Sequence, residues 1–206
     1  MKEVTDLIPV GKGKSEVWLD GEFAFVLYRA EINRLDIHKG SSVSDAELES
    51  IYKDVLCPRA FNRLLYLLGS RDMTRRELED KLISGKYPKE ARDYALGRME
   101  EYGYVNDESY ARRYIECYRG RKSIGYIRQA LMKKGISREL IAEALTESEE
   151  QMPAREQERE LIKNLLEKRR YDPQEADRKE KQRMYAYLSR RGFKGEDISA
   201  VMFDLT

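Results

Sequence analysis

The sequence of 206 residues is poor in the residue types that build metal, redox and membrane-spanning sites. It has two cysteines, Cys57 and Cys117, and one histidine, His38. A zinc site made of cysteine and histidine alone needs four ligands, so these three residues exclude one. We expect two buried thiols rather than a disulfide, and a loop or surface position for His38. No apolar run approaches the roughly 20 residues of a membrane span, which favours a cytoplasmic protein without membrane contact.

The sequence motifs of common enzymes are also missing. There is no glycine-rich phosphate loop, no HExxH or GxSxG motif, and no close cluster of carboxylates with a histidine. Acidic residues are plentiful, but they alternate with Lys and Arg along predicted helix faces, which is typical of a solvated surface with weak ion pairs. We therefore expect a protein that is not an enzyme and that uses no cofactor and no metal.

Charged residues make up 37% of the chain, against about 25% in an average domain. The net charge is only +1, so the molecule as a whole is not a polyanion binder. The balance is local, because residues 1–57 carry 7 basic and 11 acidic side chains, whereas residues 110–134 carry 8 basic and 1 acidic. The basic segment predicts a surface that steers the protein toward an anionic partner, either protein or nucleic acid.

Residues 1–57 form an N-terminal extension that differs from the rest of the chain. The run EVWLDGEFAFVL is rich in β-forming residues, and Asp20-Gly21 at its centre is a strong signal for a hairpin turn. The following run, SSVSDAELESIYKDVL, predicts a helix with Ser44 as N-cap and Glu47 completing a capping box. We expect a small β-hairpin plus a helix here.

From Pro58 onward the apolar period is helical, and the pattern repeats. LMKKGI, residues 131–136, and LSRRGF, residues 188–193, coincide at a shift of 57, and a shift of 49 places Leu82 on Leu131. A period of this size indicates a repeat array. The prediction is a mainly α, elongated array of tandem three-helix repeats at residues 58–106, 107–150 and 151–206, whose small cores need neighbouring repeats.

Helix ends are also readable from the sequence. Gly69 is a C-cap candidate, Asp107 is an N-cap candidate, and the glycine of KKG and RRG predicts a left-handed cap. The two cations before that glycine either complement the helix dipole or form a contact surface. The charged link at residues 149–160 contains Pro153 and is interpreted as a hinge or as the start of a solvated helix.

The most basic segment, Tyr110 to Lys134, has two faces. Tyr110, Tyr114 and Tyr118 recur every four residues and are more typical of a core face than of a base-stacking platform. The arginines of this segment must then face water or a partner, and we expect a real electrostatic contact there.

Three segments together resemble the RecX regulatory proteins: LLGSRDMTRRELEDKL, GYVNDESYARRYI and LMKKGISRELIAEAL. The resemblance covers about residues 58–206 and is clearest in the first two repeats. It implies a non-enzymatic modulator that binds the RecA–DNA filament and inhibits its ATPase, strand exchange and coprotease activity in DNA repair and the SOS response. The resemblance leaves direct, non-specific binding of single- or double-stranded DNA open, and we expect a monomer.

The predicted contact residues are cations of the first two repeats. They are Arg71, Arg75, Arg112, Arg113, Arg119, Lys122, Arg128, Lys133 and Lys134. Other positions match family motifs and are interpreted as structural. They are Asp72, Glu77, Leu78, Gly103, Asn106, Asp107, Tyr110, Ala111 and Gly135.

Two other function classes stay open at this point. A helix-turn-helix regulator would read duplex DNA, but no repeat has a helix dense in base-reading residues, and KKG lies at the wrong end of its helix. A scaffold for an unrelated protein partner is the other alternative.

Overall fold

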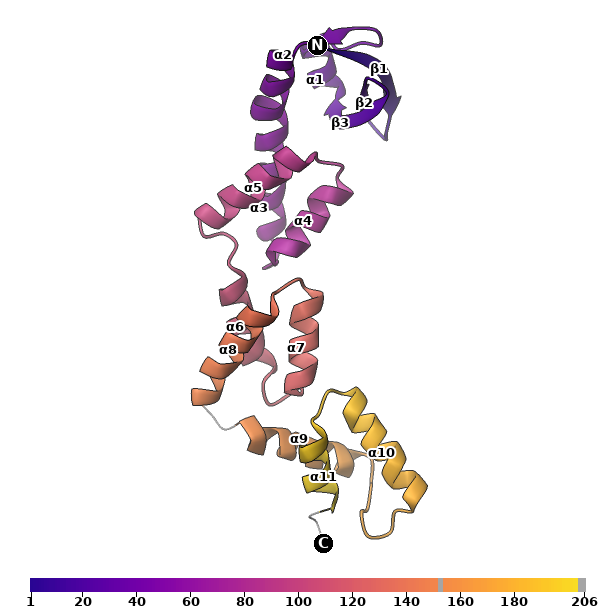
Figure 1. Cartoon of the computed structure of the whole chain (residues 1–206), viewed down its shortest axis with the longest axis vertical. Coiled ribbons are helices and arrows are strands. Elements are labelled where there is room, and N and C mark those ends of the chain that lie inside the picture. The colour runs from indigo at the N-terminus through magenta and orange to yellow at the C-terminus, as the bar shows by residue number, and fades with distance from the viewer. Residues whose placement is uncertain (152–153, 204–206) are drawn as a thin grey trace. The chain divides into compact units, whose positions relative to one another are not determined.

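The computed structural model describes residues 1–151 and 154–203, and it divides into two compact units. Unit 1 ends at Asn106 and unit 2 begins at Asp107. Both units are shown in Figure 1. Within the described residues, every helix is too short or too polar to cross a lipid bilayer.

Unit 1 begins with a four-stranded antiparallel sheet, of which the sequence predicted the β2–β3 hairpin at one edge. The strands are β1 (Lys2–Pro9), β2 (Lys14–Leu19), β3 (Glu22–Tyr28) and β4 (Ser42–Val43), in the order β3-β2-β1-β4. Asp20 and Gly21 have φ angles of 50° and 84°, as a tight turn between twisted strands requires, so the hairpin prediction is confirmed. Strands β1 and β4 were not predicted.

A single helical run then leads out of the sheet. Helix α1 (Arg29–Arg34) precedes β4, and after it α2 (Asp45–Ser50), a π-helical stretch (Ile51–Leu56) and α3 (Cys57–Leu68) follow without a break. Ser44 caps α2 in the predicted capping box with Glu47. The boundary predicted at residue 57 falls inside this run.

Helices α4 (Arg75–Ser84) and α5 (Lys89–Glu101) complete the first repeat. One buried cluster joins Val17 and Phe25 of the sheet to Leu56 of the run and to Leu78 and Leu82 of α4. The sheet and the first repeat therefore share a core, which supplies the burial that three short helices lack.

Unit 2 holds the other two repeats. The second consists of α6 (Asp107–Tyr118), α7 (Ile124–Lys133) and α8 (Arg138–Gln151), and the third of α9 (Ala154–Lys168), α10 (Arg178–Arg190) and α11 (Gly195–Phe203). Each repeat has its own buried cluster, centred on Leu131 in the second and on Leu188 in the third.

The three repeats agree in detail at the predicted shifts. A shift of 49 maps α4 onto α7 residue for residue, and Leu82, Leu131 and Leu188 are all fully buried. Thr74 and Ser123 occupy equivalent N-cap positions, and each accepts a hydrogen bond from the backbone N–H three residues on. Three-helix repeats behind an N-terminal sheet are thus confirmed as the architecture.

The glycines of KKG and RRG adopt the predicted left-handed conformation, with φ of 86° at both Gly135 and Gly192. The equivalent residue of the first repeat is Lys86, which adopts φ of 57°. Its ammonium group pairs with the buried Glu16 of β2, so a lysine here connects the repeat to the sheet. That hydrogen bond also lowers the pKa of Glu16.

Four smaller predictions have mixed outcomes. Gly69 is the C-cap of α3, but its φ of −63° is right-handed. Helix α6 begins at Asp107 itself, so this residue lies in the first turn. Cys57 is buried and His38 is exposed as expected, whereas Cys117 is exposed and the prediction of a buried thiol is wrong there.

Cys117 lies two residues, or about 200° around the helix, from the buried Ile115 of α6, and this explains its exposure. In the charged link, residues 154–160 belong to α9, which agrees with the alternative that a helix starts here, whereas Pro153 lies outside the described residues.

Candidate anion-binding surface

Three of the predicted contact arginines bind within their own unit. Arg75 Nε lies 2.8 Å from Glu100 Oε1 and so links α4 to α5. Arg112 links α6 to α8 through Glu147, at 2.8 Å, and also pairs with Glu108. The half-buried Arg119 donates to the backbone carbonyl and the hydroxyl of Ser148 in α8. These side chains hold helices together, a role that sequence spacing did not reveal.

The other predicted cations are placed at or near the surface. Arg71, Arg113, Arg128 and Lys133 are exposed. Lys122 lies over the ring of Tyr126 at 5.2 Å from its centroid. Lys134 is half-buried and lies over Tyr110 at 5.3 Å. The role of these residues in binding a partner stays a prediction.

The tyrosine stripe of α6 belongs to the core of the second repeat. Tyr110, Tyr114 and Tyr118 are half-buried and pack against its apolar cluster. Neighbouring rings lie 6.3 and 4.5 Å apart. Burial raises the pKa of the Tyr114 hydroxyl. A row of rings that packs on itself leaves little face for stacking nucleobases.

The family-motif positions have local structural surroundings. Glu77 completes the capping box of Thr74, Leu78 and Ala111 are fully buried, and Gly103 has a φ of 69°. Asp72 and Asn106 are exposed; Asp72 lies two residues before the N-cap Thr74 of α4, and Asn106 immediately precedes α6.

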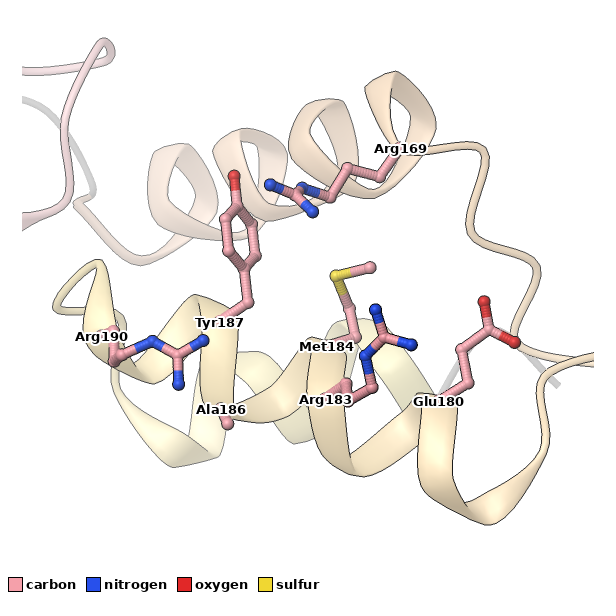
Figure 2. A pocket seen from close by; sticks show the side chains of 7 residues that line it. All are labelled: Arg169, Glu180, Arg183, Met184, Ala186, Tyr187 and Arg190. Atoms are coloured by element: carbon pink, nitrogen blue, oxygen red, sulfur yellow. The ribbon is translucent and has the colours of Figure 1, made fainter.

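Two hollows rich in cations lie in unit 2, and the sequence did not single them out. The first, here called the α9–α10 hollow, has a volume of about 660 Å³ (Figure 2). Its lining comprises Arg169, Glu180, Arg183, Met184, Ala186, Tyr187 and Arg190.

Figure 2 shows Arg169 reaching from the end of α9 toward Tyr187 on α10. The guanidinium carbon of Arg169 lies 3.8 Å from the centre of that ring, and that of Arg191 lies 4.7 Å from it. The ring thus gathers two cations, because the π-face attracts positive charge.

The second hollow, here called the inter-repeat cleft, has a volume of about 400 Å³ and is lined by both repeats of unit 2. From the second repeat come Arg121, Lys122, Ser123 and Tyr126. From the third come Leu161, Asn164, Leu165, Lys168, Arg190, Arg191 and Phe193. Five of these residues are cations, and no Asp or Glu from the described part of the chain lines the cleft.

Arg190 lines both hollows, so they form one positive surface. Most of its cations belong to the third repeat, whereas the predicted contact residues lie in the first two. The repeat alignment held a usable signal, because Lys133-Lys134 of the predicted set coincide with Arg190-Arg191 at a shift of 57. What the alignment could not show is that Arg190 and Arg191 meet cations of the preceding repeat.

Two carboxylates among the described residues of unit 2 are buried. Glu158 of α9 is only 7% exposed, and its Oε1 accepts a hydrogen bond of 2.8 Å from the backbone N–H of Ile124. Burial raises the pKa of Glu158, although that hydrogen bond works against the rise. Asp197 of α11 is 4% exposed and lies 3.3 and 3.4 Å from Arg155 and Arg159. Both carboxylates are held by partners inside unit 2.

Known families account for this arrangement of repeats. The models of the first, second and third three-helix domains of RecX match residues 60–99, 106–145 and 156–202. A regulatory protein RecX of Trichlorobacter lovleyi is 36% identical over 138 residues, which cover 65% of this chain and 87% of that relative. The chain belongs to the RecX family. The resemblance seen in the sequence is thereby confirmed.

Other RecX proteins extend the likeness to the whole chain. A regulatory protein RecX of Caldanaerobacter subterraneus subsp. tengcongensis is 29% identical over 193 residues, which cover 92% of each chain. A crystal structure of a regulatory protein RecX has a TM-score of 0.62 at 23% identity and covers 98% of both chains. The structure of RecX from Lactobacillus salivarius has a TM-score of 0.60 and covers 73% of this chain and 96% of its own. These structures share the fold.

Proposed function

We propose that this RecX chain binds the filament that RecA forms on DNA and inhibits its ATPase, strand-exchange and coprotease activities. It acts as a monomer without chemistry of its own, and its place of action is the bacterial cytoplasm, where such filaments assemble. A protein that occupies a filament surface needs a large contact area and charge complementarity, and it needs no reactive centre.

Membership of a family of regulatory proteins supports this proposal most directly. The positive surface of unit 2 supports it physically, because seven cations and one carboxylate, Glu180, line its two hollows among the residues that the structure describes. A surface of this kind suits a partner whose exposed groups are acidic side chains or phosphates.

The test is inhibition of RecA on single-stranded DNA, measured as ATP hydrolysis and as strand exchange with substoichiometric RecX chain. The parent protein is expected to slow both. The double variant Arg183→Glu/Arg190→Glu is expected to need about tenfold more protein for the same inhibition, equivalent to about 1.4 kcal/mol.

The matched control is Lys12→Glu/Lys53→Glu, which changes the net charge equally at two exposed positions of unit 1. It should inhibit like the parent. Normal RecA rates in the presence of the parent protein would reject the proposed function. Equal weakening by both double variants would show that net charge, rather than this surface, matters. Sequence-selective binding to duplex DNA without RecA would instead favour the helix-turn-helix alternative.

A further inference from the structure

At one point the second and third repeats touch through their backbones. A Cβ atom added to Gly125 would lie 2.2 Å from the carbonyl oxygen of Gly192, closer than any real contact. A Cβ atom on Gly192 would lie 2.7 Å from the backbone nitrogen of Tyr126. Only glycine fits at either position, so the start of α7 and the turn after α10 approach as closely as two backbones can.

Two buried hydrogen bonds join the repeats at the same place. Ser123 is 2% exposed, and its hydroxyl donates to the backbone carbonyl of Arg191. Glu158 accepts from the Ile124 N–H, a donor that has no partner within its own helix because it lies in the first turn. We call these contacts, together with the glycine pair, the junction.

The junction lies between the cations of the inter-repeat cleft. Arg121 and Lys122 immediately precede Ser123, and Arg190 and Arg191 immediately precede Gly192. The contact between Gly125 and Gly192 therefore brings Arg121-Lys122 and Arg190-Arg191 into one cleft, which Lys168 also lines. Like charges repel, so this cluster opposes the contact that creates it unless an anion lies between the charges.

The residues that line the cleft indicate which kind of anion it binds. Besides these cations, the cleft is lined by the apolar residues Leu161, Leu165 and the buried Phe193, and by Tyr126, which is 43% exposed. A phosphate pairs with the cations but leaves the apolar part of the lining without a partner. A single strand offers phosphates together with unstacked bases and sugars, whereas a duplex keeps its bases inside.

We propose that the inter-repeat cleft binds the sugar–phosphate backbone of single-stranded nucleic acid, and that Ser123, Gly125 and Gly192 are positioning residues that assemble it by joining the two repeats. This inference deepens the proposed function by naming a ligand for part of the positive surface. Its test contains no recombinase, so either proposal can fail alone.

The test is fluorescence anisotropy with a labelled oligothymidylate of about 15 nucleotides, titrated with the full chain at several salt concentrations. Each phosphate contact contributes about 0.7 to the slope of log K against log salt. Arg121→Gln/Arg190→Gln removes one cation from each wall, and neither guanidinium has an ion pair among residues 1–151 and 154–203. This variant should flatten the slope by about 1.4. Lys12→Gln/Lys53→Gln should leave the slope unchanged.

Gly125→Ala keeps every charge and tests the junction itself. It should weaken oligothymidylate binding about tenfold, because the walls separate. Gly97→Ala is the matched control, since Gly97 lies on α5 of unit 1 with no atom within 4 Å of an added Cβ, and it should bind like the parent. If the junction had only a structural role, oligothymidylate would not change the hydrogen-exchange rate of the Ile124 amide. Because we propose that the junction assembles the binding site, saturating oligothymidylate should slow this exchange in the parent.

Four outcomes would overturn the inference: an unchanged salt slope in Arg121→Gln/Arg190→Gln, parent-like binding by Gly125→Ala, equal affinity for a duplex of the same length, or equally strong binding of a polyglutamate peptide. The last result would assign the cleft to an acidic protein segment. If Gly125→Ala fails to fold, ultraviolet cross-linking of the parent to oligothymidylate decides. Cross-links should map to Tyr126 or Phe193, and their absence from both would refute the site.

Discussion

Replacing Gly125 by alanine adds one methyl group where the backbones of the second and third repeats lie in close contact. The new Cβ would lie 2.2 Å from the Gly192 oxygen, whereas ordinary contact begins near 3.4 Å. The backbones must therefore separate by about 1.2 Å, the difference between these distances. Backbone cannot rotate away as a side chain tip can, so the junction has to open.

The free-energy cost of opening the junction follows from the hydrogen bonds that the opening breaks. Lengthening the 2.8 Å bond from Ile124 N–H to Glu158 by that amount takes it beyond hydrogen-bond range, and the bond from Ser123 to Arg191 opens with it. Each buried polar group left without a partner costs about 1–3 kcal/mol. Alanine regains about 1 kcal/mol of helix propensity in α7. The junction should therefore weaken by about 1–5 kcal/mol.

Amide hydrogen exchange at Ile124 measures this opening directly. The Ile124 N–H lies in the first turn of α7, so its only protection in the described structure comes from Glu158 of the other repeat. Exchange at this amide should accelerate at least about tenfold in Gly125→Ala, which corresponds to 1.4 kcal/mol or more. Amides in the middle of α7 should change much less, because their partners lie within the helix.

Gly97→Ala separates the effect of contact from the effect of propensity. A Cβ atom at Gly97 of α5 has space around it, so the same substitution there should stabilise unit 1 by about 0.5–1 kcal/mol. If Gly125→Ala behaved like Gly97→Ala, with slower exchange and higher stability, the close approach of the two backbones would be refuted.

Three further perturbations test other contacts. Glu158→Gln keeps an acceptor for Ile124 but removes the charge. Burial raises the pKa of Glu158 in the folded protein, so the parent loses stability as pH rises from the ordinary carboxyl range through that raised value. The variant has no such titration. Its melting temperature relative to the parent should therefore be higher at pH 8 than at pH 5. Arg119→Ala breaks the bonds to Ser148 and should lower stability by about 1–3 kcal/mol in urea titrations; an unchanged midpoint would make Arg119 available as a contact residue. Leu188→Ala empties the small core of the third repeat and should cost about 2–5 kcal/mol there, while exchange-protected amides of unit 1 keep their rates.

Much of the fold was predictable because it rests on local interactions. The turn at Asp20-Gly21 needs two residues that tolerate positive φ, and the N-caps Ser44 and Thr74 form hydrogen bonds to residues three positions away. The repeats could also be predicted from local patterns, because each copy keeps a buried leucine at the same position of its helical period. The two-residue strand β4 was not, because its partner β1 lies about forty residues away.

The candidate site was predictable only in part. Sequence spacing found a basic segment at residues 110–134, but it treated Arg112 and Arg119 as available for a partner. Arg119 reaches Ser148, 29 residues on, and Arg112 reaches Glu147, 35 residues on. The sequence shows only that these residues are positively charged. In the folded protein their side chains form hydrogen bonds that connect α6 to α8.

By itself, the sequence determined the helices, their caps, the threefold repetition and the family, because each depends on residues a few positions apart or on the order of short motifs. Only the tertiary structure decided which cations remain at the surface and which hold helices together. It also decided the meaning of Gly125, which the sequence shows merely as a glycine in the first turn of a helix. That glycine meets Gly192 across 67 positions of chain, and such a contact depends on how two separately folded repeats pack, which no local pattern records.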